Sequence, residues 1–353
     1  MTEPTSLPIF LLISIVKIAV VLVITLTAVA YTVLLERKVL GRMQNRWGPS
    51  RVGPFGLLQP LADGIKLFLK EDMMPLAVER PLFVLAPIIA LGCALISIAV
   101  VPFGATYLYK GVDITQIANV NVGLLVVLGV TSIGVYGIAL SGWSSNNKYS
   151  LFGSLRATAQ VISYELALGL SLVGVVMRAG SLNLRHIVDS QSAHGALSWN
   201  IVGGLQIVAF FIYLMAAYAE TNRSPFDLPE AESELVAGYH TEYSSMKFAM
   251  FFMAEYANMI TVACVATLLF FGGASSPFGH TFDGFANGAF AHVAFSIFWF
   301  VSKILAFILL YIWVRATLPR FRYDQLMGFG WKFLLPVAMI NILVTALALA
   351  YHG

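Results

Sequence analysis

Long apolar runs separated by short polar segments dominate this chain. The first run, Leu7–Leu35, contains one charged residue, Lys17, and exceeds the roughly 20 residues that a helix needs to cross a bilayer. We expect the Lys17 side chain to extend toward the nearer membrane surface. The runs predict eight transmembrane helices, near Leu7–Leu35, Pro81–Phe103, Val120–Gly142, Leu151–Val176, Asn200–Ala219, Met246–Phe271, Ala289–Val314 and Phe333–Ala350.

Two shorter segments have the spacing of helices that lie beside a membrane. In Gly56–Lys70 the apolar residues recur on one face, which is typical of a helix on the membrane surface or on a partner subunit. Leu182–Ser190 is a shorter candidate. The pattern therefore predicts one domain, residues 1–353, with an all-α integral membrane fold: a bundle of about eight transmembrane helices with surface amphipathic helices.

The composition agrees with a membrane protein. Of the 353 residues, 59% are hydrophobic and 11% are charged, and the mean hydropathy is +0.82, whereas soluble domains carry about 25% charged residues. Cys93 and Cys264 lie in apolar runs and form no CxxC motif. Because an iron–sulfur cluster usually takes four cysteine ligands, we expect none in this chain alone. Two buried free thiols are the favoured interpretation, with a disulfide as the alternative.

The placement of the charges predicts an orientation. Loops 36–80, 143–150, 220–245 and 315–332, with the adjoining helix ends, hold 16 of the 21 Lys and Arg residues, whereas the opposite side has Lys110, Arg178 and Arg185. Basic loops of membrane proteins lie on the cytoplasmic side. We therefore expect a multi-pass membrane protein with its basic loops in the cytoplasm (or matrix) and both termini on the opposite side.

Three charged residues lie deep inside predicted spans: Glu165, Glu255 and Lys303. An ionisable residue at membrane depth costs roughly 2.5–3.5 kcal/mol on insertion scales, so it indicates a function. A hydrogen bond to a neighbouring helix is the structural alternative for Glu165. The sequence allows a pair between Lys303 and either glutamate, and such a pair fits proton displacement as well as simple charge neutralisation.

The segment between the fifth and sixth spans is densely acidic. Asp227 and Glu230 have the spacing of a capping box at a helix start, and Gly238 fits the end of that helix. Carboxylates this close predict raised carboxyl pKa values, which a proton relay near neutral pH requires. An ordinary acidic surface loop is the alternative. The carboxylates concerned are Glu220, Asp227, Glu230, Glu232, Glu234 and Glu242.

Several kinds of site have no signature in this sequence. There is no GxGxxG, Walker A or HExxH motif, and no nucleophile–His–acid set. The six histidines are scattered without the spacing of metal ligands. We therefore expect no metal site, and no complete redox or hydrolytic site in this chain alone.

Four blocks of sequence carry a resemblance to a known family. They are ERKVLGRMQNRWGPSRVG (Glu36–Gly53), GWSSNNKYSLFGSLRATAQVISYE (Gly142–Glu165), the acidic segment with the start of the next span (Glu220–Tyr256), and RATLPRFRYDQLM (Arg315–Met327). Through them nearly the whole chain resembles the quinone-site membrane subunit of respiratory complex I, which is the H subunit of the bacterial NADH:quinone oxidoreductase and has a mitochondrial counterpart. Ser50 departs from the family, which usually has Asn there.

The resemblance implies a role for the chain. Ubiquinone or menaquinone would enter from the bilayer through a tunnel in this subunit and be reduced near an iron–sulfur cluster of a neighbouring subunit. Other subunits would hold NADH, FMN and the clusters. Tunnel positions of the family fall on Arg37 and Arg315, with Phe226 and Phe252 as apolar lining. The implied partners are peripheral-arm quinone-site subunits and antiporter-like membrane subunits, together with membrane lipid and quinone but no nucleic acid.

The proton-transfer positions of the family match the carboxylates found above. They fall on Glu165, Glu220, Asp227, Glu230, Glu232, Glu234, Glu242 and Glu255; Lys303 comes from residue-level reasoning alone. The hypothesis is that quinone reduction changes the charge around the acidic loop, and that Glu255 and Glu165 pass the change to the antiporter-like partners. The alternatives are a scaffold subunit that only docks the peripheral arm, and a stand-alone cation/proton antiporter, which favours broken helices in paired repeats.

Overall fold

The structure is a computed structural model that describes residues 7–109, 112–192, 195–203, 206–227, 236–278 and 289–352. Helices make up most of it. One two-residue antiparallel hairpin pairs Leu108 with Asp113 and Tyr109 with Val112. The elements are α1 (Leu7–Met43), η1 (Pro54–Gly56), α2 (Gln59–Leu69), α3 (Arg80–Ser97), η2 (Ile98–Val100), β1 (Leu108–Tyr109), β2 (Val112–Asp113), α4 (Gly123–Ser144), α5 (Lys148–Ala179), α6 (Leu184–Asp189), η3 (Gly195–Ser198), η4 (Asn200–Gly203), α7 (Gln206–Glu220), η5 (Gly238–His240), α9 (Ser245–Phe270), α10 (Ala289–Thr317), α11 (Tyr323–Phe329), the π-helical turn η8 (Gly330–Leu334) and α12 (Leu335–His352).

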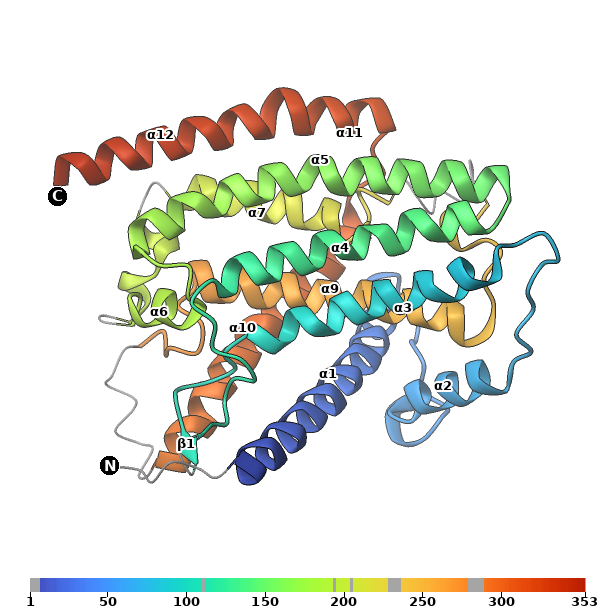
Figure 1. The fold of residues 1–353 in the computed structure, drawn as a ribbon, viewed down its shortest axis with the longest axis horizontal. Coiled ribbons are helices and arrows are strands. Elements are labelled where there is room, and N and C mark those ends of the chain that lie inside the picture. Colours follow the sequence, from blue (N-terminus) through green and yellow to red (C-terminus); the bar gives the residue numbers. More distant parts are fainter. Residues whose placement is uncertain are drawn as a thin grey trace.

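The long helices form a bundle with two tilted members. Helices α3, α4 and α5 pack in sequence order, α9 packs against α3, and α12 covers the outer side of α5. Helices α1 and α10 cross the direction of the others obliquely (Figure 1). The end of α12 lies at the end of the bundle that also carries α6, and α2 lies at the opposite end (Figure 1).

Helix boundaries follow from local sequence signals. Asn147 begins α5 because its side chain accepts a hydrogen bond from the Tyr149 N–H at 2.9 Å. Gly180 ends α5 in the left-handed conformation with φ 66°, where its N–H donates to the Val176 carbonyl at 2.8 Å. Asn183 begins α6 in the same way as Asn147 begins α5, with the Arg185 N–H at 2.9 Å.

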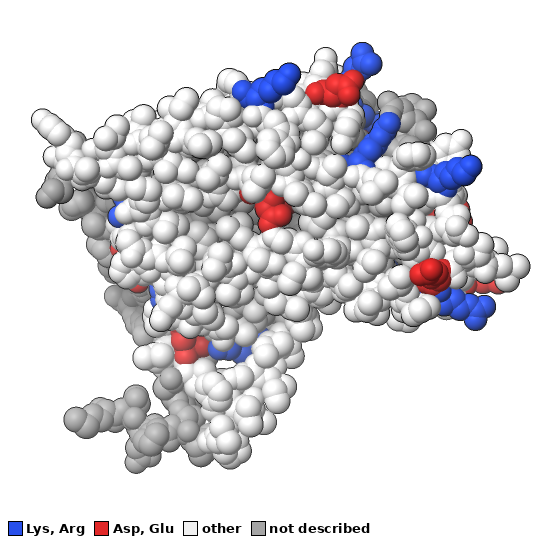
Figure 2. All heavy atoms as spheres, turned by 45° about the horizontal axis from the view of Figure 1, so that its top comes forward, with Lys and Arg blue, Asp and Glu red and all other residues white. Residues whose placement is uncertain are grey.

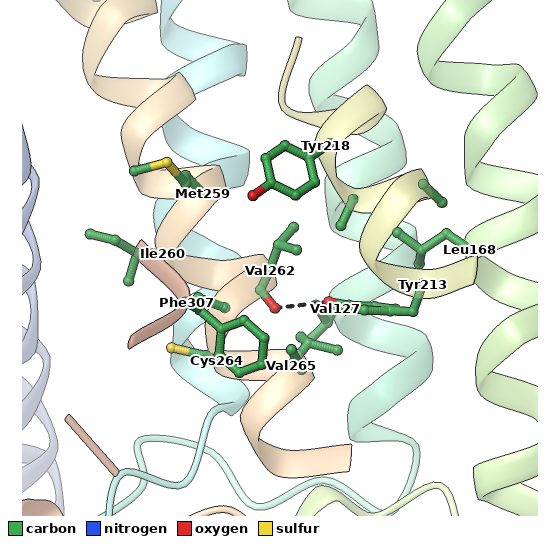
Figure 3. Close-up of a cluster of buried hydrophobic side chains, with 14 of the residues drawn as sticks. Val127, Leu168, Tyr213, Tyr218, Met259, Ile260, Val262, Cys264, Val265 and Phe307 are labelled. Carbon is green, nitrogen blue, oxygen red and sulfur yellow. Dashed lines mark hydrogen bonds between the residues drawn. The ribbon is translucent and has the colours of Figure 1, made fainter. Parts of the chain in front are cut away.

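The core lies where α7 and α9 meet, enclosed by α4, α5 and α10. Figure 3 shows Tyr213 of α7 directed at α9, where its hydroxyl donates to the Val262 carbonyl at 2.8 Å. Both side chains are buried, as are Leu168 of α5 and Phe307 of α10. The tyrosine hydroxyl therefore finds a partner inside the apolar core, as a buried polar group requires.

Seven helices in the described parts of the chain are long and apolar enough to cross a membrane. The predicted span Asn200–Ala219 differs, because its regular helix α7 has 15 residues, from Gln206 to Glu220. At about 1.5 Å per residue it is roughly 22 Å long, shorter than the ~30 Å hydrocarbon core. The last span begins earlier than predicted, since α11, η8 and α12 run on from Tyr323 to His352.

The two predicted short helices are confirmed as α2 and α6. The cysteines are confirmed as buried free thiols. The ammonium group of Lys17 on α1 donates to the carbonyls of Asp113, Gln116 and Ile117 at 3.0, 2.7 and 3.1 Å. Lys17 therefore ties the outer half of the tilted helix α1 to the loop that follows the hairpin.

Candidate functional site

A buried cluster of charges lies where α1, α9 and α10 meet the segment after α7. Arg223 lies between two glutamates, with one nitrogen 3.6 Å from a Glu36 oxygen and the other 3.6 Å from a Glu255 oxygen. The Tyr256 hydroxyl donates to Glu36 at 2.7 Å, and Arg315 forms an ion pair with the same carboxylate. The Arg223 guanidinium also lies 4.2 Å from the centre of the Tyr256 ring.

Arg223 stays charged in this position. Burial opposes its charged form, but Tyr256, Glu255 and Glu36 outweigh that effect and raise the pKa of Arg223 above its usual value. Two of its nitrogens, Nε and Nη2, nevertheless have no hydrogen-bond partner among the described residues. Arg223 is therefore a charged group shared by two carboxylates, with no contact to either shorter than 3.6 Å.

A small cavity connects this cluster to a second acidic site. The cavity has a volume of about 40 Å³ and is lined by both Glu255 and Glu220, with Thr131 and Tyr239. The Tyr239 hydroxyl donates to Glu255 at 3.0 Å. Because a water molecule needs roughly 10–15 Å³ and several polar partners, the cavity is large and polar enough to hold water. Glu255 and Glu220 therefore share one polar cavity.

Glu165 lies beyond Glu220 on α5. The charge of Glu165 acts directly on Glu220, which is also hydrogen-bonded by Thr131. The Ser132 hydroxyl of α4 donates to the Glu165 carboxylate in a short hydrogen bond. Glu165 is partly exposed on the α4–α5 side of the bundle, and Figure 2 shows acidic surface near the middle of a broad uncharged face. The path of carboxylates thus begins in the bundle interior and reaches its surface.

Two further predicted carboxylates, Glu242 and Asp227, have partners of their own. Glu242 accepts a hydrogen bond from the Asn147 side chain at 2.6 Å, next to the start of α5. Asp227 is buried and forms an ion pair with Arg320 at 3.2 Å. These partners differ from those of Glu255 and Glu220, so Glu242 and Asp227 belong neither to the charge cluster nor to the cavity. Glu230, Glu232 and Glu234, with the predicted capping box, lie outside the described residues.

Lys303 contacts backbone carbonyls rather than Glu165 or Glu255, the two partners that the sequence allowed. Its ammonium group donates to the carbonyls of Phe271, Gly273 and Ser275 at 2.7, 2.8 and 2.7 Å. It also lies 4.4 Å from the centre of the Trp199 ring. Lys303 therefore caps the carbonyl groups at the end of α9, the helix that carries Glu255, and a cation is favourable at that end of a helix dipole.

The residues predicted to line a quinone path fall into two places. Arg37 of α1 forms an ion pair with Asp63 of α2 at 2.8 Å, and Phe252 of α9 lies 4.9 Å from the Tyr256 ring, beside the charge cluster. Arg315 belongs to the cluster itself. Phe226, in contrast, stacks on Phe321 with ring centres 5.6 Å apart and lines a different groove, between α7, α10 and α11.

Two serines at the start of α9 bind α2 and the chain that follows it. The Ser245 hydroxyl contacts the carbonyls of Leu67 and Lys70, both at 2.9 Å, and the Met73 N–H donates to Ser244 at 2.9 Å. Helix α2 is therefore attached to α9 as well as to Arg37 of α1. These contacts hold the amphipathic helix beside the inner halves of α1 and α9.

Sequence reasoning missed four members of the cluster. Glu36 was assigned to the loop after the first span, whereas α1 continues to Met43 and keeps Glu36 buried inside it. Arg223 was counted only as a basic loop residue, and Tyr239 and Tyr256 were not considered as hydrogen-bond donors. One signal was available: Glu36 and Arg223 both lie within the sequence blocks that carry the family resemblance.

Comparison with known proteins decides the family. The family described as NADH dehydrogenase matches residues 16–346. The NADH-quinone oxidoreductase H subunit numbered 2 of Koribacter versatilis (strain Ellin345) is 62% identical over 356 residues, which cover 98% of this chain and 99% of that protein. This chain belongs to the H-subunit family of NADH-quinone oxidoreductase.

Other members of the H-subunit family are similar over the same length. The H subunit numbered 1 of Solibacter usitatus (strain Ellin6076) is 48% identical over 389 residues, covering 97% of this chain and 98% of that protein. The H subunit of Thermomicrobium roseum is 51% identical over 335 residues, covering 93% of each. The resemblance noted in the four sequence blocks is therefore confirmed for nearly the full chain.

Proposed function

We propose that this chain is the membrane subunit of a proton-pumping NADH:quinone oxidoreductase in which quinone reduction is coupled to proton movement through buried carboxylates. One observation carries the proposal: the contacts from Arg315 through Glu36 and Arg223 to Glu255 open onto a cavity shared with Glu220. This connected row runs from the side of α1 and α2 toward Glu165 on α5.

The quinone would approach between α1, α2 and α9. Phe252 supplies an apolar surface for an isoprenoid tail there, and the Arg37–Asp63 pair holds α2 against α1. Arg315 and Tyr256, both bound to Glu36, lie at the inner end of this approach. Electrons would come from an iron–sulfur cluster in a partner subunit, since the two cysteines of this chain are too few to hold one.

Reduction of a quinone to a quinol takes two electrons, which the partner's cluster would supply, and two protons. Groups beside the headgroup that give up those protons become more negative, and this changes the charge next to Glu36. Arg223 contacts both Glu36 and Glu255, and a shift of its guanidinium toward one of them leaves the other short of counter-charge. That carboxylate then favours its protonated form. The change passes across the cavity to Glu220 and Glu165 and from there to antiporter-like partners, which would dock where Glu165 reaches the α4–α5 surface.

The same proposal includes the setting of the chain. It would lie in a bacterial inner membrane with its basic loops in the cytoplasm and both termini in the periplasm. The peripheral arm, with NADH, FMN and the clusters, would bind the basic end. Figure 2 shows Lys and Arg side chains concentrated toward the end of the molecule that carries α2 in Figure 1.

The test replaces Glu255 or Glu165 with Gln in the assembled complex, which removes the ionisable group but keeps its shape. We expect proton pumping and quinone reductase activity to fall together by roughly ten-fold or more. Glu71→Gln, at an exposed carboxylate, is the matched control and should change neither rate. Normal rates in assembled Gln variants would contradict the relay. Loss of assembly alone would favour a scaffold, and ion movement by the isolated chain in liposomes would favour an antiporter.

A further inference from the structure

A large apolar groove lies away from the charge cluster, between α7, α10 and α11. It has a volume of about 580 Å³ and almost wholly apolar walls. Phe211 and Met215 of α7 and Leu318 after α10 line it, and all three are substantially exposed. A hollow of this size and chemistry on the outside of a membrane protein does not stay empty, because the surrounding hydrocarbon fills it.

The groove lies at membrane depth because of the length of α7. This helix, roughly 22 Å long, is shorter than the ~30 Å hydrocarbon core, so it leaves part of that depth uncovered. Helix α10 and the start of the last helical segment form the opposite wall. Phe226, which follows α7, also lines the groove, so the open space lies beside the Glu220 end of α7, the end that the proposed orientation directs toward the inner leaflet.

The inner end of the groove is closed by contacts between its two walls. The Phe226 and Phe321 rings stack with centres 5.6 Å apart, and the Phe321 N–H donates to the Pro225 carbonyl at 3.2 Å. Arg320 pairs with Asp227 at 3.2 Å, and about half of the Arg320 side chain remains exposed. These three contacts thus join the segment after α10 to the loop that carries Asp227.

Two arginines, Arg320 and Arg322, flank Phe321 at this closed end, whereas Arg315 of the same segment pairs with Glu36 in the charge cluster. Arg322 is exposed beside Phe321. Basic pockets at the cytoplasmic side of membrane helices favour anionic headgroups. A neutral quinone gains nothing from such a rim, and Arg37 and the Glu36 cluster lie elsewhere.

We propose that the groove binds an acyl chain of an anionic phospholipid, whose phosphate contacts Arg320 and Arg322. The lipid chain fills the space beside α7 and packs against Leu318 and Phe321. The lipid phosphate would then be a second anion in contact with Arg320, beside the Asp227 carboxylate. The bound lipid therefore holds the segment after α10 against the loop that carries Asp227. This inference rests on the membrane fold and not on the quinone or proton proposal.

The test measures lipid on the intact, detergent-solubilised complex. Leu318→Trp fills the groove, and Leu343→Trp, on the exposed face of α12, is the matched control. We expect mass spectrometry of the purified complex to show loss of at least one tightly bound anionic phospholipid in Leu318→Trp and no loss in the control. An unchanged lipid content in Leu318→Trp would overturn the proposal.

Arg322→Gln tests the headgroup separately and keeps the groove intact. When delipidated complex is titrated with phosphatidylglycerol or phosphatidylethanolamine, the variant should bind phosphatidylglycerol about five-fold more weakly and phosphatidylethanolamine unchanged. Equal binding of the two lipids by the unaltered protein would overturn the headgroup assignment. A photo-crosslinking amino acid in place of Leu318 identifies the occupant: a lipid adduct supports the proposal, whereas a quinone or a partner polypeptide contradicts it.

Discussion

At the scale of single residues, the account depends on one arginine that serves two carboxylates. Arg223 is buried and lies 3.6 Å from both Glu36 and Glu255, too far for two tight hydrogen bonds and close enough for strong attraction. Glu36 also has Arg315 and Tyr256, whereas Glu255 has Tyr239. The two carboxylates therefore differ in how strongly they depend on Arg223.

Removing Arg223 should expose that difference. Arg223→Met leaves Glu255 buried without its cation, and breaking a buried ion pair by removing one partner costs about 3–5 kcal/mol. Adding Glu255→Gln removes the stranded charge, so the double variant should recover part of the loss. Thermal unfolding of the unaltered complex, the two single variants and the double variant measures the coupling between the residues. If the loss of stability in the double variant equals the sum of the losses in the two single variants, the residues are not coupled.

A second prediction concerns pH and Tyr243, in the loop before α9. Its ring stacks on Phe83 with centres 4.0 Å apart, and burial raises the pKa of Tyr243 to about 12, against a smaller opposing effect of Ser144. The folded chain thus holds the phenol proton more tightly than the unfolded chain, so stability is complete below pH ~10 and falls as the pH rises toward 12.

Tyr243→Phe keeps the ring and removes the titrating group. We expect the variant to match the unaltered protein near pH ~8 and to lose about 2 kcal/mol less stability by pH ~12, as followed by thermal unfolding across that range. Parallel pH profiles for the two proteins would show that Tyr243 does not contribute to the alkaline loss.

Residues of the site differ in how far sequence can reveal them. Glu165 and Glu255 stand out because carboxylates are rare in apolar runs. Glu36 and Arg223 do not stand out, because each follows an apolar run and looks like an ordinary boundary charge until the helices are placed together. The partner of Lys303 could not be predicted either, since backbone carbonyls at the end of α9 leave no mark in the sequence.

At the scale of elements, two close backbone approaches hold the site in shape. A Cβ atom on Gly137 of α4 would lie 2.8 Å from the Ala86 carbonyl of α3, and one on Gly153 of α5 would lie 2.7 Å from Gly238 of η5. Small residues at such crossings let helices approach closely. The second approach sets α5, which carries Glu165, against the end of the acidic loop.

Two glycines on α5 provide a matched comparison. Gly153→Ala places a methyl group against the backbone of Gly238 and should cost about 1–3 kcal/mol, with loss of the Asn147–Glu242 contact nearby. Gly169→Ala has open space around it and should be neutral or slightly stabilising. Thermal unfolding of the two variants tests the contact, and equal stabilities would contradict it.

The sequence predicted the positions of some helices better than their lengths and directions. Long apolar runs identify α1, α5 and α10 because each exceeds the length of a span. The short helix α7 was overestimated, since its apolar run continues through residues that form the 3-10 turn η4 instead. The oblique directions of α1 and α10 depend on contacts between distant segments, such as Lys17 with the loop after the hairpin, and no local pattern encodes them.

At the scale of the whole molecule, the placement of the basic loops predicts an orientation. Single cysteines test it, because Cys93 and Cys264 are buried and give little background labelling. In intact cells a membrane-impermeant thiol reagent should label Tyr351→Cys, at an exposed outer position, and should leave Trp47→Cys unlabelled until the membrane is opened. The reverse pattern would invert the proposed topology.

The molecule as a whole connects a site beside α1, α2 and α9 with the outer surface of α5. Family membership was recognisable from the sequence because four long blocks match in order. The contacts between residues of different blocks, in contrast, could be identified only in the folded structure. Glu36, Arg223, Glu255 and Glu220 come from distant parts of the chain and meet only in the folded bundle. The central claim is that these buried carboxylates change protonation when quinone is reduced.

Redox-triggered infrared difference spectroscopy of the assembled complex tests that claim most directly. Reducing the bound quinone should produce a carboxyl-group difference signal that is lost or shifted in Glu255→Gln and retained in Glu71→Gln. An identical signal in the unaltered complex and in an assembled, quinone-binding Glu255→Gln complex would contradict the account.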